Sequence, residues 1–348
     1  ISGDVDVDGT LETDNLTIGG AQGTDGQVLT STGSGVGWED AGGGGVTFKV
    51  FGTNSIMVGD DATGTINSAN QNTALGLDVF AALTTGDDNV AIGFEAGKAL
   101  TSGGQNTFVG SQAGESTDDG FGNVAVGINA LDANCANYNT AVGYNALGAV
   151  STSGNQNTGV GSLAGFNITF GDNNTCIGND AGITGSPGGA ITTGSNRIAL
   201  GDENVTHIYA ATQFISTSDA RDKTDFTPLD LGLDFVKALA PLTFKWDKRS
   251  KYGNKYEEGY DLNAQTPDGT HKEDRLDVGF KAQDVEALEI AAGYNKDNNT
   301  NLISDHTDDG TQIGIKYGKL IPVLVKAIQE QNVLIEALTS RVTTLEGS

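Results

Sequence analysis

The chain has 348 residues, of which 51 are glycine and five are proline, and its formal net charge at pH 7 is −26. A surface this acidic repels phosphate backbones and anionic lipid head groups, which excludes nucleic-acid and membrane binding as expected functions. The two cysteines have no disulfide or zinc spacing, and no apolar run reaches the roughly 20 residues that a membrane-spanning helix needs.

Residues 1–48 alternate apolar and polar residues in short pieces separated by glycine. This pattern predicts a β-rich shaft segment of short strands joined by turns. The piece from Gly26 to Trp38 resembles a segment that recurs in phage fibre shafts. Because the sequence begins at Ile1 and has Met57 as its single methionine, we expect a fragment or a processed chain.

Residues 49–204 form a repeat array built on an Asn-x-Ala-aliphatic-Gly unit. The unit recurs, with small variations, at Asn72–Gly76, Asn89–Gly93, Asn106–Gly110, Asn123–Gly127, Asn139–Gly143, Asn157–Gly161 and Asn174–Gly178. Longer variants flank the set at Asn54–Gly59 and Asn196–Gly201. Successive glycines are almost evenly spaced, and only the last step, from Gly178 to Gly201, is clearly longer. In six repeats an alanine occupies the third position after the glycine. Such a constant period is typical of stacked repeats.

Each unit holds a strand of only three or four residues, which becomes stable when the units stack in parallel. Stacking aligns one aliphatic side chain per coil, and the glycine after it permits a turn with positive φ. The alanine is small enough to pack at the next corner, the asparagines can form an amide ladder, and the atypical end repeats are typical of caps. The array resembles the head of trimeric autotransporter adhesins, a left-handed parallel β-roll, although the period here is longer. A monomeric β-solenoid is the alternative.

After a connector at residues 205–217, charged and aromatic residues become more frequent. The region opens with the pattern S-D-x-R-x-K at Ser218–Lys223, which is also compatible with an N-capping serine before a charged helix. Three segments follow in order, at Phe235–Trp246, Gly279–Glu286 and Tyr317–Pro322. As an ordered set, these motifs resemble the endosialidase-type intramolecular chaperones found at the C-termini of phage tailspikes and fibres, over about residues 214–348.

This resemblance implies a Ser-Lys dyad, a self-cleaving serine endopeptidase that acts once on its own chain. Ser218 is then the nucleophile, Lys223 is its base, and the bond between Thr217 and Ser218 is the one that is cut. A serine hydroxyl needs a base to take its proton, and a lysine is a base only when neutral, the form that burial favours. If three chains are needed for that burial, cleavage is tied to assembly. Asp219, Asp222 and Asp225 oppose the role unless they point away, because nearby carboxylates favour the charged lysine.

A heptad pattern occupies the C-terminal end of the chain. Its a and d positions are Ile321, Leu324, Ile328, Gln331, Ile335, Leu338, Val342 and Leu345. The pattern predicts a coiled coil from about residue 319, with one polar d residue that sets the register. The resemblance implies that three strands assemble, and an amphipathic helix packed on its own domain is the alternative. The chaperone is expected over residues 218–348.

The predicted fold class is mainly β: an elongated homotrimer with parallel β-roll or β-solenoid repeats, then an α+β chaperone with a C-terminal trimeric coiled coil. The resemblance implies a phage tail fibre that is assembled in the host cytoplasm, carried on the virion and joined to an upstream tail protein. Its expected partner is a host-surface glycan or outer-membrane protein. No cofactor or metal is expected, because His207, His271 and His306 lack metal-ligand spacing. The alternatives are a polysaccharide-degrading tailspike, with acid pairs such as Asp87–Asp88, and a bacterial trimeric surface adhesin.

Overall fold

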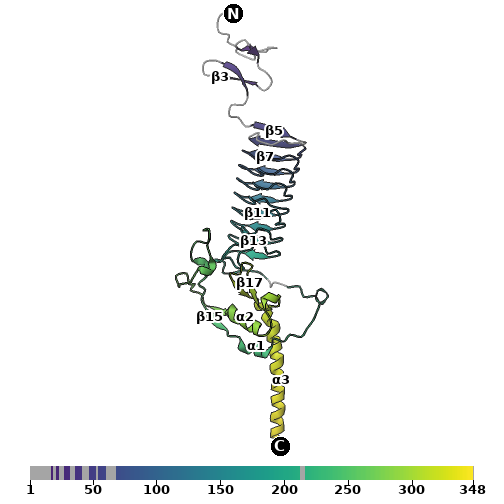
Figure 1. Cartoon of the computed structure of the whole chain (residues 1–348), viewed down its shortest axis with the longest axis vertical. Helices are drawn as coiled ribbons and strands as arrows, with labels where there is room; N and C mark the ends of the chain where they lie inside the picture. Colours follow the sequence, from purple (N-terminus) through teal and green to yellow (C-terminus); the bar gives the residue numbers. More distant parts are fainter. Residues whose placement is uncertain are drawn as a thin grey trace.

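The computed structural model describes residues 54–59, 68–211 and 216–347, together with the backbone of strands at 17–18, 21–22, 27–31, 36–40 and 47–51. Figure 1 shows an elongated molecule in which a stack of strands leads to a smaller mixed region and a projecting C-terminal helix. Towards the N-terminus, β1 (Thr17–Ile18) pairs antiparallel with β2 (Ala21–Gln22), and β3 (Gln27–Ser31) pairs antiparallel with β4 (Val36–Asp40). These strands lie in the segment for which short strands and turns were predicted.

A ten-stranded sheet runs along the stack. Its first two strands, β5 (Thr47–Phe51) and β6 (Ser55–Gly59), are antiparallel, and each later pair is parallel with equivalent residues in register. The later strands are β7 (Thr73–Gly76), β8 (Val90–Ile92), β9 (Thr107–Val109), β10 (Val124–Val126), β11 (Thr140–Val142), β12 (Thr158–Val160), β13 (Thr175–Ile177) and β14 (Ile198–Leu200). One strand per repeat, in sequence order, confirms the predicted parallel β-solenoid.

The array asparagines are buried and bonded to one another, which confirms the amide ladder. The Asn106 Nδ2 atom donates to Asn89 Oδ1 at 3.0 Å and to the Gly120 carbonyl at 2.8 Å. The Asn106 Oδ1 atom accepts from the backbone N–H of Asn123 at 2.9 Å. Backbone N–H to side-chain Oδ1 bonds of the same kind link the asparagines from Asn72 to Asn174. The Asn106 side chain thereby satisfies polar groups of neighbouring coils that burial would otherwise leave unpaired.

Glycine is required after each strand for two reasons. Seven of these glycines have φ between +111° and +140°, a conformation that residues with a Cβ rarely adopt. The coils also approach closely here, because a Cβ on Gly110 would lie 2.5 Å from the Gly127 carbonyl oxygen. The alanines that follow at the third position are fully buried, as predicted for the corner positions: Ala96, Ala113, Ala130, Ala146, Ala164 and Ala181.

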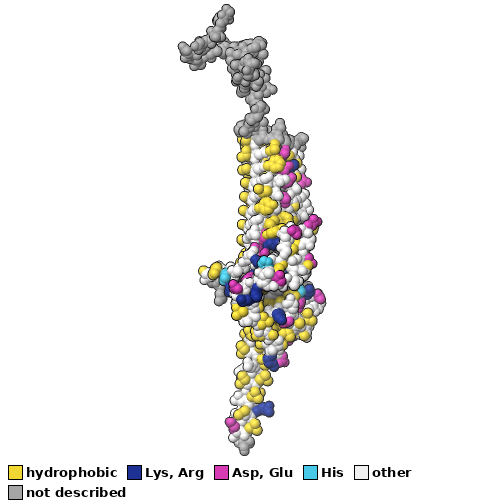
Figure 2. All heavy atoms as spheres, turned by 90° about the vertical axis from the view of Figure 1, so that its left-hand side faces the viewer, with side chains coloured by type: hydrophobic (Ala, Val, Ile, Leu, Met, Phe, Trp, Pro, Cys, Tyr) yellow, Lys and Arg dark blue, Asp and Glu magenta, His cyan; other side chains and the backbone are white. Residues whose placement is uncertain are grey.

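Each strand turns its central residue into the solenoid and its aliphatic third residue outward. The central residue is most often alanine, and the core is completed by larger side chains such as Leu100, Phe108 and Leu147, all with no exposed surface. The outward residues are 36–48% exposed, namely Leu75, Ile92, Val126, Val142, Val160, Ile177 and Leu200. Figure 2 shows rows of hydrophobic side chains along the stack. The solenoid thus has an apolar row on its surface as well as an apolar core.

The C-terminal region confirms the predicted α+β class. It contains α1 (Leu233–Ala238), β15 (Leu242–Phe244), β16 (Asp277–Gly279), α2 (Ala282–Ala291), β17 (Ser304–His306), β18 (Ile313–Ile315) and α3 (Leu320–Glu346). Its two sheets are the antiparallel pairs β15–β16 and β17–β18. Phe235, Val285, Ile303 and Val323 pack together in a core separate from that of the solenoid.

The helix α3 is packed on its own domain only at its start. Leu320, Val323 and Ala327 are buried, whereas every residue from Gln331 to Gly347 is exposed. All the predicted heptad positions lie among the exposed residues, including Ile321 and Ile328 at 64%. A single chain therefore leaves the heptad face uncovered. Within the described residues, no helix combines the length and the apolar character that crossing a bilayer requires.

Replacing Asn106 by alanine should lower the free energy of unfolding by about 3 kcal/mol, because the change unpairs buried groups in neighbouring coils and leaves a cavity. Denaturant unfolding followed by circular dichroism measures the loss. The matched control is Asn179→Ala, since Asn179 is an exposed asparagine of the same array. Equal stability of the two variants would contradict the role of the ladder.

Candidate functional site

A short helical turn brings the two predicted catalytic side chains together. Residues Ala220–Asp222 form a 3-10 turn, and its N-cap is Asp219, whose side chain accepts from the Arg221 N–H at 2.9 Å. The turn returns Lys223 to Ser218, so that Lys223 Nζ lies 2.5 Å from Ser218 Oγ and 3.3 Å from the Ser218 carbonyl oxygen. The capping residue is thus Asp219, one position after the serine for which a capping role was considered.

One of the carboxylates beside the dyad is engaged elsewhere. The Asp219 carboxylate forms an ion pair with Arg221 at 2.7 Å. The hydrogen bonds from Arg221 lower the pKa of Asp219. The negative charge of Asp219 is thus paired with the Arg221 guanidinium and not with Lys223. The arginine of the S-D-x-R-x-K pattern therefore pairs with the N-cap carboxylate of this turn.

Both members of the dyad are open to solvent in the single chain. Thr217, Ser218 and Lys223 are all exposed, as are residues 220–228. The arrangement places a hydroxyl and an amine beside the peptide bond between Thr217 and Ser218, but it does not bury them. Since a lysine loses its proton more readily when desolvated, the single chain lacks the burial that the base role expected of Lys223 requires.

The other motif segments pack against one another within the module. Tyr317 stacks on Phe280 with ring centroids 6.2 Å apart, and its hydroxyl accepts from the Phe280 N–H at 3.3 Å. A Cβ on Gly279 would clash with the Tyr317 hydroxyl, so a side chain at this position would displace the tyrosine. Phe244 and Trp246 meet edge to face at 5.1 Å. Residues far apart in the sequence thus form one framework around β15 and β16.

The buried carboxylate of Glu289 is a residue that sequence reasoning missed. It is 1% exposed and lies on α2, one helical turn after the buried Val285. Its oxygens accept from the backbone N–H groups of Leu302, Ile303 and Ser304 at 2.6–2.8 Å. It therefore holds the start of β17 against α2. Its place on the buried face of the helix, one turn after a valine, is the signal that could have identified it.

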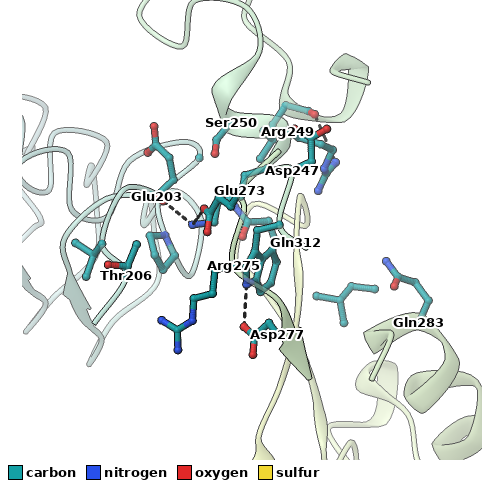
Figure 3. Close-up of a pocket in the computed structure, with 17 residues that line it drawn as sticks. Glu203, Thr206, Asp247, Arg249, Ser250, Glu273, Arg275, Asp277, Gln283 and Gln312 are labelled. Atoms are coloured by element: carbon teal, nitrogen blue, oxygen red, sulfur yellow. Dashed lines mark hydrogen bonds and ion pairs between the residues drawn. The ribbon is translucent and has the colours of Figure 1, made fainter. Parts of the chain in front are cut away.

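A cavity of about 550 Å³ lies where the solenoid meets the module (Figure 3). Glu203 and Thr206 line it from the solenoid side, and Asp247, Arg275 and Gln312 line it from the module. Ser218 and Lys223 are not among the lining residues. Within the described part of the chain, no group of three or more His, Cys, Asp or Glu side chains could hold a metal ion.

Comparison with known families identifies one segment. Residues 218–294 match the family model described as chaperone of endosialidase, and the match begins at Ser218. It includes the dyad, α1, β15, β16 and α2. Searches of curated proteins and of solved structures gave no match. The chain therefore carries an endosialidase-type chaperone segment behind a parallel β-solenoid, an arrangement that fits a tail fibre with a C-terminal chaperone.

Proposed function

We propose that the chain is the distal part of a homotrimeric phage tail fibre, whose C-terminal module guides assembly and then cuts itself off between Thr217 and Ser218. The observation that carries the proposal is the 2.5 Å approach of Lys223 Nζ to Ser218 Oγ, at the first residue of the chaperone match. The fibre is carried on the virion, joined to an upstream tail protein, and attaches to a host-surface glycan or outer-membrane protein.

The proposed cleavage is an acyl shift followed by hydrolysis. Lys223 in its neutral form takes the hydroxyl proton, and Ser218 Oγ attacks the carbonyl carbon of Thr217. The bond from that carbon to the Ser218 nitrogen breaks, the nitrogen receives the proton, and an ester joins Thr217 to Ser218 Oγ. Water then hydrolyses the ester, leaving a carboxylate on Thr217 and a free hydroxyl on Ser218. The reaction occurs once per chain, on its own backbone.

The solenoid gives a physical reason for a chaperone. Its coils share the same asparagine, glycine and alanine positions, so a neighbouring chain displaced by one whole coil would meet nearly equivalent partners. Repetitive strands of this kind specify register weakly, and pairing between distant segments is slow to nucleate. A module that aligns the three C-termini first removes the choice of register. After the cut the fibre cannot easily refold, and its lifetime then depends on how slowly it unfolds.

Two exposed apolar features support assembly from copies of this chain. The heptad face of α3 is uncovered along the whole helix, and the outward row that includes Leu75 and Leu200 is uncovered along the solenoid. Exposed apolar surfaces this long are typical of interfaces. Because both features run lengthwise, neighbours related by an axis along the molecule can cover both.

The acid pairs considered for glycoside hydrolysis do not favour a tailspike. Asp87, Asp88, Asp118 and Asp119 are exposed turn residues. Asp87 accepts from the Asn70 backbone N–H at 2.7 Å, so it serves the link between coils. Incubating the fibre with host polysaccharide would separate the two functions, since a tailspike shortens the polymer and an adhesion fibre leaves it intact.

Replacing Ile328 and Ile335 together by aspartate should abolish trimer formation and leave the chain insoluble, because charges at two a positions cannot be buried in a coiled coil. Multi-angle light scattering of the soluble fraction measures the mass. The control is Val333→Asp, which adds the same charge to an exposed f position and should leave the trimer intact. A stable wild-type monomer or dimer would refute the trimer.

Replacing Ser218 by alanine should abolish cleavage while leaving the trimer, because the hydroxyl is lost but folding precedes the cut. Lys223→Ala should also block cleavage, and Lys223→Arg should not restore it, since arginine stays charged near neutral pH. Intact-mass spectrometry follows the fragments 1–217 and 218–348.

The control for this series is Ser216→Ala, which removes an exposed hydroxyl just before the cut and should cleave normally. The coiled-coil variant should remain uncut if assembly supplies the missing burial. A wild-type chain that keeps its full mass as a folded trimer would rule out the peptidase and leave only the chaperone.

A further inference from the structure

The basic residues of this acidic chain are concentrated in the module. Residues 1–217 have 3 Lys and Arg against 22 Asp and Glu, a net charge of −19. Residues 218–348 have 16 Lys and Arg against 23 Asp and Glu, a net charge of −7. Five of the 16 lie within residues 245–255, namely Lys245, Lys248, Arg249, Lys251 and Lys255. Figure 2 shows Lys and Arg side chains gathered near the junction of the solenoid and the module.

Lys255 joins this loop to two buried carboxylates of the solenoid's C-terminal end. Its Nζ atom lies 2.9 Å from Asp180 Oδ2 and 3.0 Å from both carboxylate oxygens of Glu203. Asp180 is 1% exposed and Glu203 is 7% exposed. Tyr256 also donates its hydroxyl proton to Asp180. Burial lowers the pKa of Lys255, but the hydrogen bonds to Asp180 and Glu203 outweigh it and raise the pKa above its ordinary value.

Neighbouring residues of the loop extend this contact. Lys248 Nζ donates to the Glu203 carbonyl oxygen at 2.7 Å, and Lys251 donates to the side chain of Asn204. The loop thus binds both the backbone and the side chains of residues 203–204, which follow the last strand of the solenoid.

The turn between β17 and β18 holds the same coil at a second place. Asp309 accepts from the Ala190 backbone N–H at 2.9 Å, and Asp308 forms an ion pair with Arg197. Gln312 Nε2 donates to the Ser186 carbonyl at 3.3 Å. This coil, from Gly178 to Gly201, is the longest of the array, so the module contacts the part of the solenoid that departs most from the repeat.

We propose that residues 248–256 and 307–312 form a clamp for the last coil of the solenoid, and that this clamp keeps the module bound after its covalent link is cut. The inference rests on the proposed cleavage and extends it. Both fragments carry net negative charge, so they repel each other outside the clamp. Removal of one partner from a buried ion pair leaves the other charge uncompensated, which weakens an interface strongly. Lys255 is therefore the residue on which retention of the module depends.

The test separates retention from self-cleavage. A recognition sequence for a site-specific protease is inserted between the exposed residues Thr217 and Ser218 in the Ser218→Ala chain, so that only the added protease cuts. Size-exclusion chromatography with light scattering at about 0.15 M salt should then show the two fragments eluting together. In the same background, Lys255→Met should raise the dissociation constant of the fragments about 100-fold.

The matched control is Lys245→Met, because Lys245 lies in the same loop but pairs with Asp274 of the module at 4.0 Å; it should retain the fragment as the parent does. Should Lys255→Met prevent folding, Asp308→Asn tests the second contact and should also weaken retention. Separation of the parent fragments, or equal retention in the Lys245 and Lys255 variants, would overturn the clamp. Failure of the proposed peptidase appears separately, as an uncut wild-type chain.

Discussion

The amide ladder of the buried asparagines is the interaction on which the solenoid depends. The strands are three or four residues long and most of their central residues are alanine, so each coil buries little apolar surface. Hydrogen bonds from one asparagine to the next supply what the small core lacks, since an unpaired buried amide would be costly. Glycine at the end of each strand allows the coils to approach closely enough for these bonds to form.

Because the coils repeat so regularly, strand pairing is incomplete only at the ends of the array. Internal coils provide identical partners above and below, whereas the last strand, β14, pairs only with β13 in the sheet. The module contacts this end through the turn that contains Asp308 and Asp309 and through the loop that contains Lys255. An irregular, charged surface of the module thus contacts the solenoid at the end where no further coil follows to pair with the last strand.

The contact between Ser218 and Lys223 and the burial of this pair depend on different levels of structure. Contact between Ser218 and Lys223 needs only a single turn, so one short run of consecutive residues creates it. Exclusion of water needs groups from elsewhere, and the exposed position of the turn in one chain shows that this chain alone does not provide them. In the proposed fibre, separating the two requirements delays cleavage until the chains have assembled.

Local and periodic features were predictable from the sequence. The near-constant period of the repeats placed every strand of the array, the alanine corners, the ladder and the positive-φ glycines, because each coil repeats the same contacts. The heptad of α3 was predictable for the same reason. Which way the aliphatic residue of each strand points was not, because both faces of so short a strand are compatible with the pattern. Tertiary structure alone revealed which groups Lys255 and the Glu289 carboxylate bind. Lys255 lies in the module and meets Asp180 of the solenoid, and Glu289 on α2 binds the backbone at the start of β17. Contacts of this kind join unrelated segments, and they leave no period in the sequence.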